Sequence, residues 1–338
     1  MRIRAGGAVS KAPAIVGIGG AHVDRIGHVS GPFRPGASNP GAMVERVGGC
    51  MANMLRVARA LSGDAVGLIS ARGGDMAGRA VAEALDEAGI DDHSAVFLDR
   101  PTPTYTAIMD ETREVRAALA DMDLYETGLA RHLGRAEPRA LIAGAAIVVV
   151  DANLPPAAIG AVLYAARSPV VALAVSPAKA ERLAPHAARF AVTFMNRREC
   201  NALIGRNTDA TLDPAALTRL SALGFARAVI SDGDRAVTVR DGETAFRQPV
   251  GTVAAPVDVT GAGDALAGAV IAHWPTMALG KAVRLGVAAA AATIAVRDPF
   301  RADIGACDLA GVAAALPAPA PLDADPAPIG DDHAADPL

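Results

Sequence analysis

The amino-acid sequence predicts an α/β fold with three layers, α/β/α, built on a mainly parallel central β-sheet with a small second β-sheet beside it. Three observations support this prediction. Short apolar runs typical of buried strands alternate along the chain with stretches typical of helices. Hydrophobic residues make up 51% of the 338 residues, so a large core can be buried, although only 3% are aromatic. Two turn-rich regions interrupt the alternation, and these predict the small sheet.

The chain begins with residues 1–12, which are expected to form a flexible extension, and residues 13–316 are expected to form one domain. Strands of the main sheet are predicted at residues 14–19, 65–70, 146–151, 170–175, 190–194 and 228–231. Helices are predicted at residues 51–61, 76–88, 156–166, 178–187, 197–204 and 214–223. Because the strands are continuous apolar runs, they are expected to be buried on both faces, as strands of parallel sheets are.

The two interruptions lie at about residues 23–47 and 104–120. The second is typical of a hairpin, with strands at 105–109 and 115–119 around a polar turn. On these residues alone an ordinary edge hairpin is the more common outcome. A lid over a bound substrate is the functional interpretation.

The C-terminal residues 317–338 are rich in Pro, Ala and Asp and contain almost no large apolar side chains. Such a composition cannot offset the entropy lost on ordering. A disordered tail is therefore predicted.

Charge and cysteine content exclude several classes of function. The formal net charge is −4, without the basic stripe that a nucleic-acid or acidic-membrane partner requires. The longest apolar runs, 140–150 and 285–296, are shorter than the roughly 20 residues of a membrane span. The three cysteines are far apart, which argues for a reducing compartment. We therefore expect a cytoplasmic protein with neither a nucleic acid nor a membrane as partner.

The most informative segment is Asp258-Val-Thr-Gly-Ala-Gly-Asp264, which precedes an apolar helical stretch. The backbone amides of Gly261, Ala262 and Gly263 would lie in the first helical turn, where free N–H groups and the helix dipole favour an anion. Asp264 could accept a proton from a hydroxyl beside that anion, and the dipole is expected to keep it ionised. Phosphoryl transfer to an alcohol needs these two groups together. The structural alternative is a glycine-rich turn that only caps a packed helix.

Two better-known phosphate motifs do not match. A Gly-x-x-x-x-Gly-Lys-Ser/Thr loop is absent from the sequence, and Gly280-Lys281 is followed by Ala282. The start of a dinucleotide fingerprint at Gly17-Ile-Gly19 ends with His22 where glycine is required.

Polar residues also follow several predicted strands, where ligands of parallel sheets bind. They are Asp151 with Asn153, Asn196 with Glu199, and Ser231 to Gly233. The Asn196 and Glu199 pair is equally typical of a helix capping box, and both interpretations can hold together.

The segment 258–271 resembles the C-terminal motif of the ribokinase-like (PfkB) carbohydrate kinases. The resemblance covers roughly residues 14–315 and implies a ribokinase-like fold with a β-sheet lid. It implies that Asp264 is the catalytic base and that Gly261, Ala262 and Gly263 form the anion hole.

Other stretches carry the same resemblance. Gly48-Gly49-Cys-Met-Ala-Asn53 is similar to the family's N-terminal sugar-binding motif, and Asp24 matches the acid that binds two sugar hydroxyls. Asn196-Arg-Arg-Glu199 matches the Asn-x-x-Glu that organises Mg²⁺, through water, and the phosphates of ATP. Ser231-Asp-Gly233 matches the nucleotide-binding turn. Asp258 matches a loop that binds a monovalent cation such as K⁺ in many relatives.

Several short stretches look like the bacterial pseudouridine kinase branch of this family. They are residues 38–41, 102–107, 120–123, 151–154 and 175–179. This likeness implies 5′-phosphorylation of pseudouridine, with Asp24, Gly48, Gly49 and Asn53 on the ribose. It places Asn39 and Thr104 near the base, and Asn153 is a further candidate for the substrate.

The resemblance leaves other functions open. A kinase for another sugar or nucleoside, such as ribose, adenosine or fructose, is the alternative within the family. A binding protein that kept the fold without turnover is the alternative from another class. Relatives are often dimers joined through the lid, which implies a homodimer here.

Overall fold

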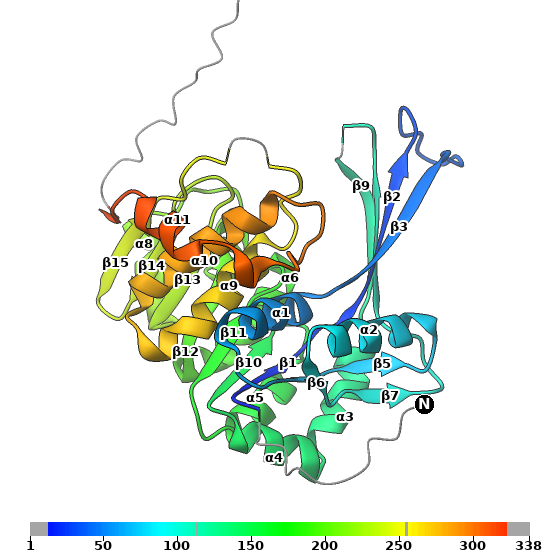
Figure 1. Ribbon diagram of the computed structural model, residues 1–338, viewed down its shortest axis with the longest axis horizontal. Helices are drawn as coiled ribbons and strands as arrows, with labels where there is room; N and C mark the ends of the chain where they lie inside the picture. The colour runs from blue at the N-terminus through cyan, green and yellow to red at the C-terminus, as the bar shows by residue number, and fades with distance from the viewer. Residues whose placement is uncertain (1–12, 113, 254–255, 323–338) are drawn as a thin grey trace, which may run out of the picture.

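The computed structural model describes residues 13–112, 114–253 and 256–322. In these residues the main sheet has ten strands in the order β16-β15-β14-β13-β12-β11-β10-β1-β4-β6 (Figure 1). The strands from β13 to β6 in this order are parallel: β13 (Arg227–Ser231), β12 (Phe190–Asn196), β11 (Val170–Leu173), β10 (Ile147–Asp151), β1 (Ile15–Ile18), β4 (Val66–Ile69) and β6 (Ile90–Asp92). The antiparallel strands at the other edge are β14 (Val237–Asp241), β15 (Thr244–Gln248) and β16 (Ala320–Pro321). The predicted mainly parallel sheet is confirmed.

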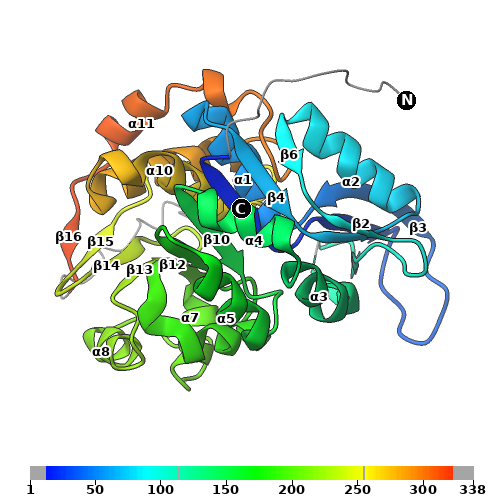
Figure 2. The same cartoon turned by 90° about the horizontal axis from the view of Figure 1, so that it is seen from below.

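Helices cover both faces of this sheet, which confirms the three layers (Figure 2). One face carries α1 (Cys50–Ser62), α2 (Met76–Glu87), α9 (Ala262–His273), α10 (Leu279–Ile294) and α11 (Leu309–Ala315), with the short η3 (Trp274–Thr276) and η4 (Ile304–Ala306). The other face carries η1 (Tyr125–Leu129), α3 (Ala130–Leu133), α4 (Ala136–Gly144), α5 (Pro156–Ala165), α6 (Pro177–Ala180), η2 (Glu181–Arg189), α7 (Arg197–Leu203) and α8 (Pro214–Ala222). Adjacent residues of one strand serve the two faces, since Val148 packs in one core cluster and Val149 in the other. This is why the strands are apolar throughout.

Small residues bring three helices of the first face very close together. A Cβ atom on Gly268 of α9 would lie 2.5 Å from the carbonyl oxygen of Met54 on α1. A Cβ atom on Gly286 of α10 would lie 2.8 Å from the carbonyl oxygen of Leu266 on α9. Both neighbours are backbone atoms, so α9 is held at one position between α1 and α10.

A second sheet, which we call the lid, projects from the body of the molecule (Figure 1). Its strand order is β3-β2-β8-β9, with β3 (Gly41–Gly48), β2 (His22–Val29), β8 (Thr104–Met109) and β9 (Val115–Asp121). The predicted hairpin at 104–120 is the β8–β9 pair. Two short strands, β5 (Ala71–Gly73) and β7 (Ala95–Phe97), form a separate parallel pair that was not predicted.

Two predictions about the chain's course were wrong. The helix expected at 178–187 is one α-helical turn, α6, followed by the 3₁₀ helix η2, which contains Pro185. Proline has no N–H group to donate within a helix, so a long α-helix is not favoured there. The expected tail begins too early, because β16 pairs with β15 and Leu322 is buried. The expected N-terminal extension and the rest of the expected tail lie outside the described residues.

None of the helices in the described residues combines the length and the hydropathy that a membrane span needs.

Candidate active site

The candidate site lies where the strand order of the main sheet reverses. From β1 the chain builds outward through β4 to β6, and then returns to the other side of β1 with β10. Ligands of open α/β sheets bind beyond the carboxyl ends of the strands at such a point. The lid leaves the body directly after β1, and Asp151 and Asn153 follow from the end of β10.

Asp264 lies in the first turn of α9 and contacts α1. The amide Nδ2 of Asn53 on α1 donates a hydrogen bond to Oδ2 of Asp264 at 3.0 Å. The same two helices pack closely at Gly268, one turn further along α9. The two family motifs, which are more than 200 residues apart in the sequence, therefore meet at one pair of side chains.

The helix start has the properties that an anion hole needs. Gly261 is the N-cap residue with a φ of 80°, a conformation that favours glycine. A Cβ atom on Gly261 would lie 2.0 Å from the carbonyl oxygen of Pro299, so the 297–300 loop rests directly on this residue. A Cβ atom on Gly263 would meet no atom within 4 Å, so the space above the first turn is open.

Two adjoining cavities meet at this helix start. A cavity of about 300 Å³ is lined by Asp264, Glu199 and Cys50 among others. A larger cavity of about 630 Å³ is lined by Gly233 and by apolar side chains that include Val237, Val287 and Ile294. Both cavities share four residues, namely Asn196, Ser231, Gly263 and Leu266. All the residues predicted to bind the nucleotide therefore line one continuous region. The larger of its two cavities has apolar walls, which suit a flat aromatic base.

Burial controls the electrostatics of Asp264. Burial raises its pKa to about 6, and the negative charges of Asp24 and Asp151 add to this effect, while hydrogen bonds from Cys50 and Asn53 oppose it. Asp264 was expected to be ionised, and with this pKa it is ionised at pH 7, although desolvation raises the pKa above its usual value. A base with a pKa near 6 is a better proton acceptor than an exposed carboxylate and remains ionised at pH 7.

Asn196 and Glu199 form the capping box of α7. The side chain of Asn196 accepts from the N–H of Glu199 at 2.9 Å, and Oε2 of Glu199 accepts from the N–H of Asn196 at 2.8 Å. Burial raises the pKa of Glu199 to about 7, and the charge of Asp264 contributes to the rise. The prediction that this pair forms a helix capping box is therefore confirmed, and both residues also line the smaller cavity.

The sugar-motif residues lie around the start of the lid. A Cβ atom on Gly48 would lie 2.1 Å from Oδ2 of Asp24, so the carboxylate of Asp24 lies directly against Gly48. Gly49 has a φ of 100°, and a Cβ atom there would lie 2.5 Å from the carbonyl oxygen of Gly20. His22 Nε2 lies 3.2 Å from Oδ1 of Asp24.

Asn153 is held by a buried polar chain that the sequence did not reveal. Asp151 is fully buried, and its Oδ2 accepts from the N–H of Gly20 at 2.7 Å and from Nδ2 of Asn153 at 3.1 Å. Nζ of Lys179 donates to Oδ1 of Asn153 at 2.7 Å. Lys179 and Asp151 each use one hydrogen-bonding position of the amide, so Asn153 keeps one N–H and one oxygen lone pair for a ligand. Lys179 lay inside a motif of the sequence without a role, and only the folded structure gives it one.

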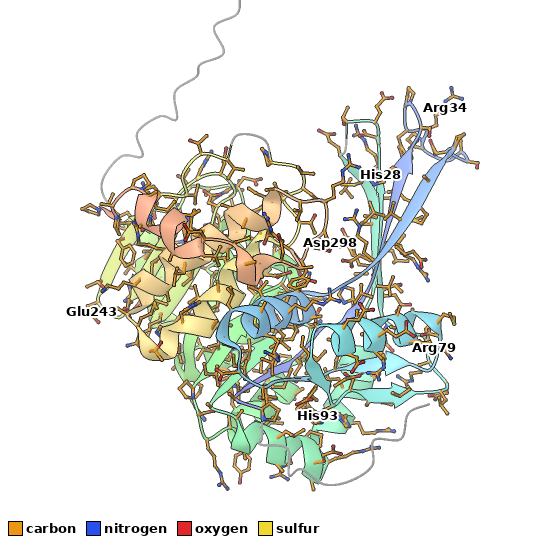
Figure 3. The ribbon with its side chains drawn as sticks, in the orientation of Figure 1. His28, Arg34, Arg79, His93, Glu243 and Asp298 are labelled. Atoms are coloured by element: carbon orange, nitrogen blue, oxygen red, sulfur yellow. The ribbon has the colours of Figure 1, made fainter. Side chains whose placement is uncertain are left out.

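Two of the predicted substrate residues are placed elsewhere. Asn39 lies at the lid tip beside Arg34, which Figure 3 labels, and its amide is used to hold that loop by accepting from the N–H of Arg34 and donating to two carbonyl oxygens. Thr104 is in register with the buried Val23, on the face of the lid opposite Asp24. The next residue, Tyr105, is in register with Asp24 and shares its face.

Comparison with known proteins agrees with this arrangement. The sequence profile of the pfkB family carbohydrate kinases matches residues 13–299. The chain belongs to the PfkB family of carbohydrate kinases. It is a kinase of this family and has the ribokinase-like fold. A search of curated proteins gives no match.

Solved structures of other kinases resemble this kinase over most of its length. A carbohydrate kinase from Agrobacterium tumefaciens is 34% identical, with a TM-score of 0.76 over 90% of this chain and 98% of that one. A ribokinase from Arabidopsis thaliana, complexed with ribose and ATP, is 18% identical, with a TM-score of 0.75 over 89% and 99% of the two chains. A ribokinase from Cryptococcus neoformans in complex with ADP is 19% identical, with a TM-score of 0.68 over 88% and 98%.

The residues of this kinase fit magnesium. The capping box uses only Oε2 of Glu199, so Oε1 remains for a metal or its water. Among the described residues no cluster of three or more His, Cys, Asp or Glu side chains could hold a metal alone. Mg²⁺ needs few protein ligands, because it keeps several waters and binds largely through substrate phosphates.

The residues around Asp258 do not fit a monovalent metal ion. Oδ1 of Asp258 accepts from the N–H of Thr260 at 2.9 Å, and Oδ2 lies 3.9 Å from the Nη1 atom of Arg46. The kinase therefore already has a positive charge beside this carboxylate.

Proposed function

We propose that this kinase phosphorylates the 5′-hydroxyl of a nucleoside with ATP, and that pseudouridine is the acceptor. One observation carries the assignment to hydroxyl phosphorylation. Asp264, with a pKa raised to about 6, lies between the nucleotide cavities and the sugar-motif residue Asn53. A hydroxyl bound there can lose its proton to Asp264 as it attacks the terminal phosphate.

Each remaining group has a separate task in this reaction. Asp24 accepts hydrogen bonds from two ribose hydroxyls, and Asn53 holds the carboxylate of Asp264 toward the acceptor. The amides of Gly261, Ala262 and Gly263 stabilise the charge on the migrating phosphoryl group. Glu199, with Asn196, would hold Mg²⁺ through water, and the ion would supply positive charge to the phosphates of ATP. The lid excludes water that would otherwise hydrolyse ATP.

Tyr105 supports a nucleoside over a bare sugar. It lies one strand from Asp24 in register, so an aromatic ring shares a lid face with the residue proposed to bind the ribose. A base attached to that ribose could stack on the ring. Lys179 keeps two further N–H groups and Asn153 keeps one, and we propose that these donors bind the carbonyl oxygens of the pseudouridine base.

A sugar such as ribose is the second candidate. The ribokinase structures with ribose and ATP or with ADP share this fold, and Asp24, Gly49 and Asn53 would bind a free ribose equally well. An inert binding protein on the same fold is the third candidate. The presence of Asp264, Asn196 and Glu199 in one region argues against it.

An acceptor panel tests the proposal. Release of ADP should be measured with pseudouridine, uridine, ribose, adenosine and fructose in parallel, with Asp264→Asn as the matched inactive control. We expect pseudouridine to give the highest kcat/KM, with the new phosphate on its 5′-oxygen by phosphorus NMR. A preference for ribose would move the assignment to the second candidate. No turnover with any acceptor, with ATP still bound, would favour the binding protein.

We further propose that the kinase is a cytoplasmic homodimer joined through the lid. All seven residues of β9 are exposed, including Val115 and Leu119, and β9 is an edge strand of the lid. Its three cysteines are unpaired, and ATP-dependent chemistry suits the same reducing compartment.

A further inference from the structure

Arg46 reaches from the lid to the segment that carries the anion hole. It lies on β3 in register with Asp24 on β2, so both residues project from the same face of the lid. Its Nη1 atom donates a hydrogen bond to the carbonyl oxygen of Arg297 and lies 3.9 Å from Oδ2 of Asp258. The guanidinium thus connects the lid with two parts of the body that are distant in sequence.

Both partners of Arg46 lie in segments that lead into or pack against the anion hole. Asp258 is six residues before Asp264, and its carboxylate holds the turn at Thr260. Arg297 begins the 297–300 loop, and the Pro299 carbonyl of that loop rests against Gly261. Figure 3 labels Asp298 of this loop, which lies on the side of the body that faces the lid. Moving either partner would therefore move the amides that face the phosphate.

A carboxylate beside a carbonyl oxygen is a typical binding site for a hard cation. Here the positively charged guanidinium already contacts the carbonyl oxygen of Arg297 and faces the carboxylate of Asp258. A metal ion at this position would be repelled by the Arg46 charge. The family resemblance implies a monovalent cation at Asp258, and the contacts of Arg46 disagree with that expectation.

We propose that the Arg46 guanidinium is the built-in cation of the anion-hole segment, in the position that a monovalent metal ion would otherwise fill, so that turnover does not require K⁺. Arg46 is a positioning residue that acts through Asp258 and the 297–300 loop. Because Arg46 and Asp24 share one lid face, the same lid that carries the acceptor ligand Asp24 also carries the charge that orders the anion hole. The inference rests on the proposed phosphoryl transfer for its effect on turnover.

The kinetic test compares the wild type with two variants in potassium, sodium and tetramethylammonium chloride at equal ionic strength. We expect kcat of the wild type to differ by less than about twofold among the salts, because the Arg46 guanidinium is a covalently attached cation. Arg46→Gln should lose about tenfold or more in kcat in tetramethylammonium, and K⁺ should restore at least part of that loss by entering the vacated position. The matched control is Arg25→Gln, which removes a lid charge whose partner is the exposed Glu45. It should match wild type in every salt.

A thermal-unfolding test needs no acceptor and separates this inference from the proposed function. With ATP and Mg²⁺ present, replacing tetramethylammonium by K⁺ should leave the Tm of wild type and Arg25→Gln unchanged, and should raise the Tm of Arg46→Gln. Arg46→Lys serves if Arg46→Gln does not fold, and it should show a smaller K⁺ response because the ammonium keeps the charge. A strong K⁺ requirement of the wild type, or an Arg46→Gln variant that equals wild type in tetramethylammonium, overturns the inference. If no acceptor is phosphorylated, the proposed function fails while the thermal response to K⁺ still decides the role of Arg46.

Discussion

Asp264 is subject to two opposing demands, because the burial that makes it a stronger base also makes its charged form costly in the folded protein. Asp264→Asn should therefore reduce kcat by about 10²-fold or more, through loss of the proton acceptor. It should also stabilise the ligand-free protein at pH 8 by about 1–3 kcal/mol, because the uncharged amide replaces a carboxylate whose pKa is raised by burial. Calorimetric ATP affinity should be unchanged. Near-normal turnover would refute the role of Asp264.

The raised pKa values of Asp264 and Glu199 predict how activity and stability depend on pH. Only ionised Asp264 accepts a proton, so kcat should rise with pH through about 6 and level off above it. Only ionised Glu199 attracts magnesium, so ATP affinity in the presence of magnesium should rise through about pH 7. Asp264→Asn should keep the rise in ATP affinity near pH 7 and lose the rise in kcat near pH 6. A kcat that does not change between pH 5 and pH 8 contradicts the assignment.

The same two carboxyl groups act on stability with the opposite sign. Each binds its proton more tightly in the folded than in the unfolded chain, so folded-state stability from these groups is full below about pH 4. It should be lost as pH rises through about 6 for Asp264 and about 7 for Glu199. Comparing the urea midpoints of wild type and Asp264→Asn across this range isolates the contribution of Asp264. If the urea midpoints of the two proteins changed with pH to the same extent, Asp264 would make no such contribution.

At this scale the sequence predicted the chemical groups better than their surroundings. Asp264 and Asn53 were found from two local motifs, and they form one hydrogen-bonded pair. Lys179 and Arg46 were not assigned a role, because each acts on residues that are distant in the sequence. A lone basic residue carries no local signal that distinguishes such contacts from a solvated surface charge.

At the scale of helices and strands, the contact between α1 and α9 sets the geometry of the site. Gly268→Ala should push α9 away from α1, because the added methyl group would lie 2.5 Å from the Met54 carbonyl oxygen. The shift should weaken the Asn53 to Asp264 hydrogen bond, with a decrease in kcat of about tenfold and a destabilisation of about 1–3 kcal/mol. Steady-state kinetics and urea unfolding measure the two effects.

The control for this variant is Gly160→Ala in α5. The nearest neighbour there is the side chain of His186 at 3.2 Å, which can move, whereas the neighbour of Gly268 is backbone. The two variants gain the same helix propensity, worth about 1 kcal/mol. Gly160→Ala should therefore leave kcat unchanged. If both variants behave alike, close packing at Gly268 does not position Asp264.

The predicted elements of the main sheet agree with the structure because their apolar runs are unambiguous. The lid was less well predicted in detail. Adjacent residues of a strand point to opposite faces, so Tyr105 shares the lid face of Asp24 and Thr104 lies on the other face, which the sequence did not indicate. For Asn39, proximity to the base stays a prediction, and spacing alone does not indicate that its amide also closes the tip of the lid.

For the whole molecule, the exposed lid predicts association of two copies. We expect light scattering after gel filtration to give the mass of a dimer, because the edge strand β9 exposes apolar side chains. Leu119→Asp, which replaces a side chain that is 69% exposed, should give a monomer. The control is Tyr164→Asp on α5, where the side chain is 82% exposed but lies away from the lid. A monomeric wild type would exclude this interface.

The strand β16 has a practical consequence for any shortened version of the protein. It covers the outer edge of β15, and Arg284 donates hydrogen bonds to the carbonyl oxygens of Ala313, Leu316 and Pro317 just before it. A chain ended at Leu316 would uncover that edge and remove one of these acceptors, leaving a template on which strands of other molecules can add. Such a protein should precipitate on storage. A purification tag placed after the last residue leaves the pairing of β16 with β15 intact.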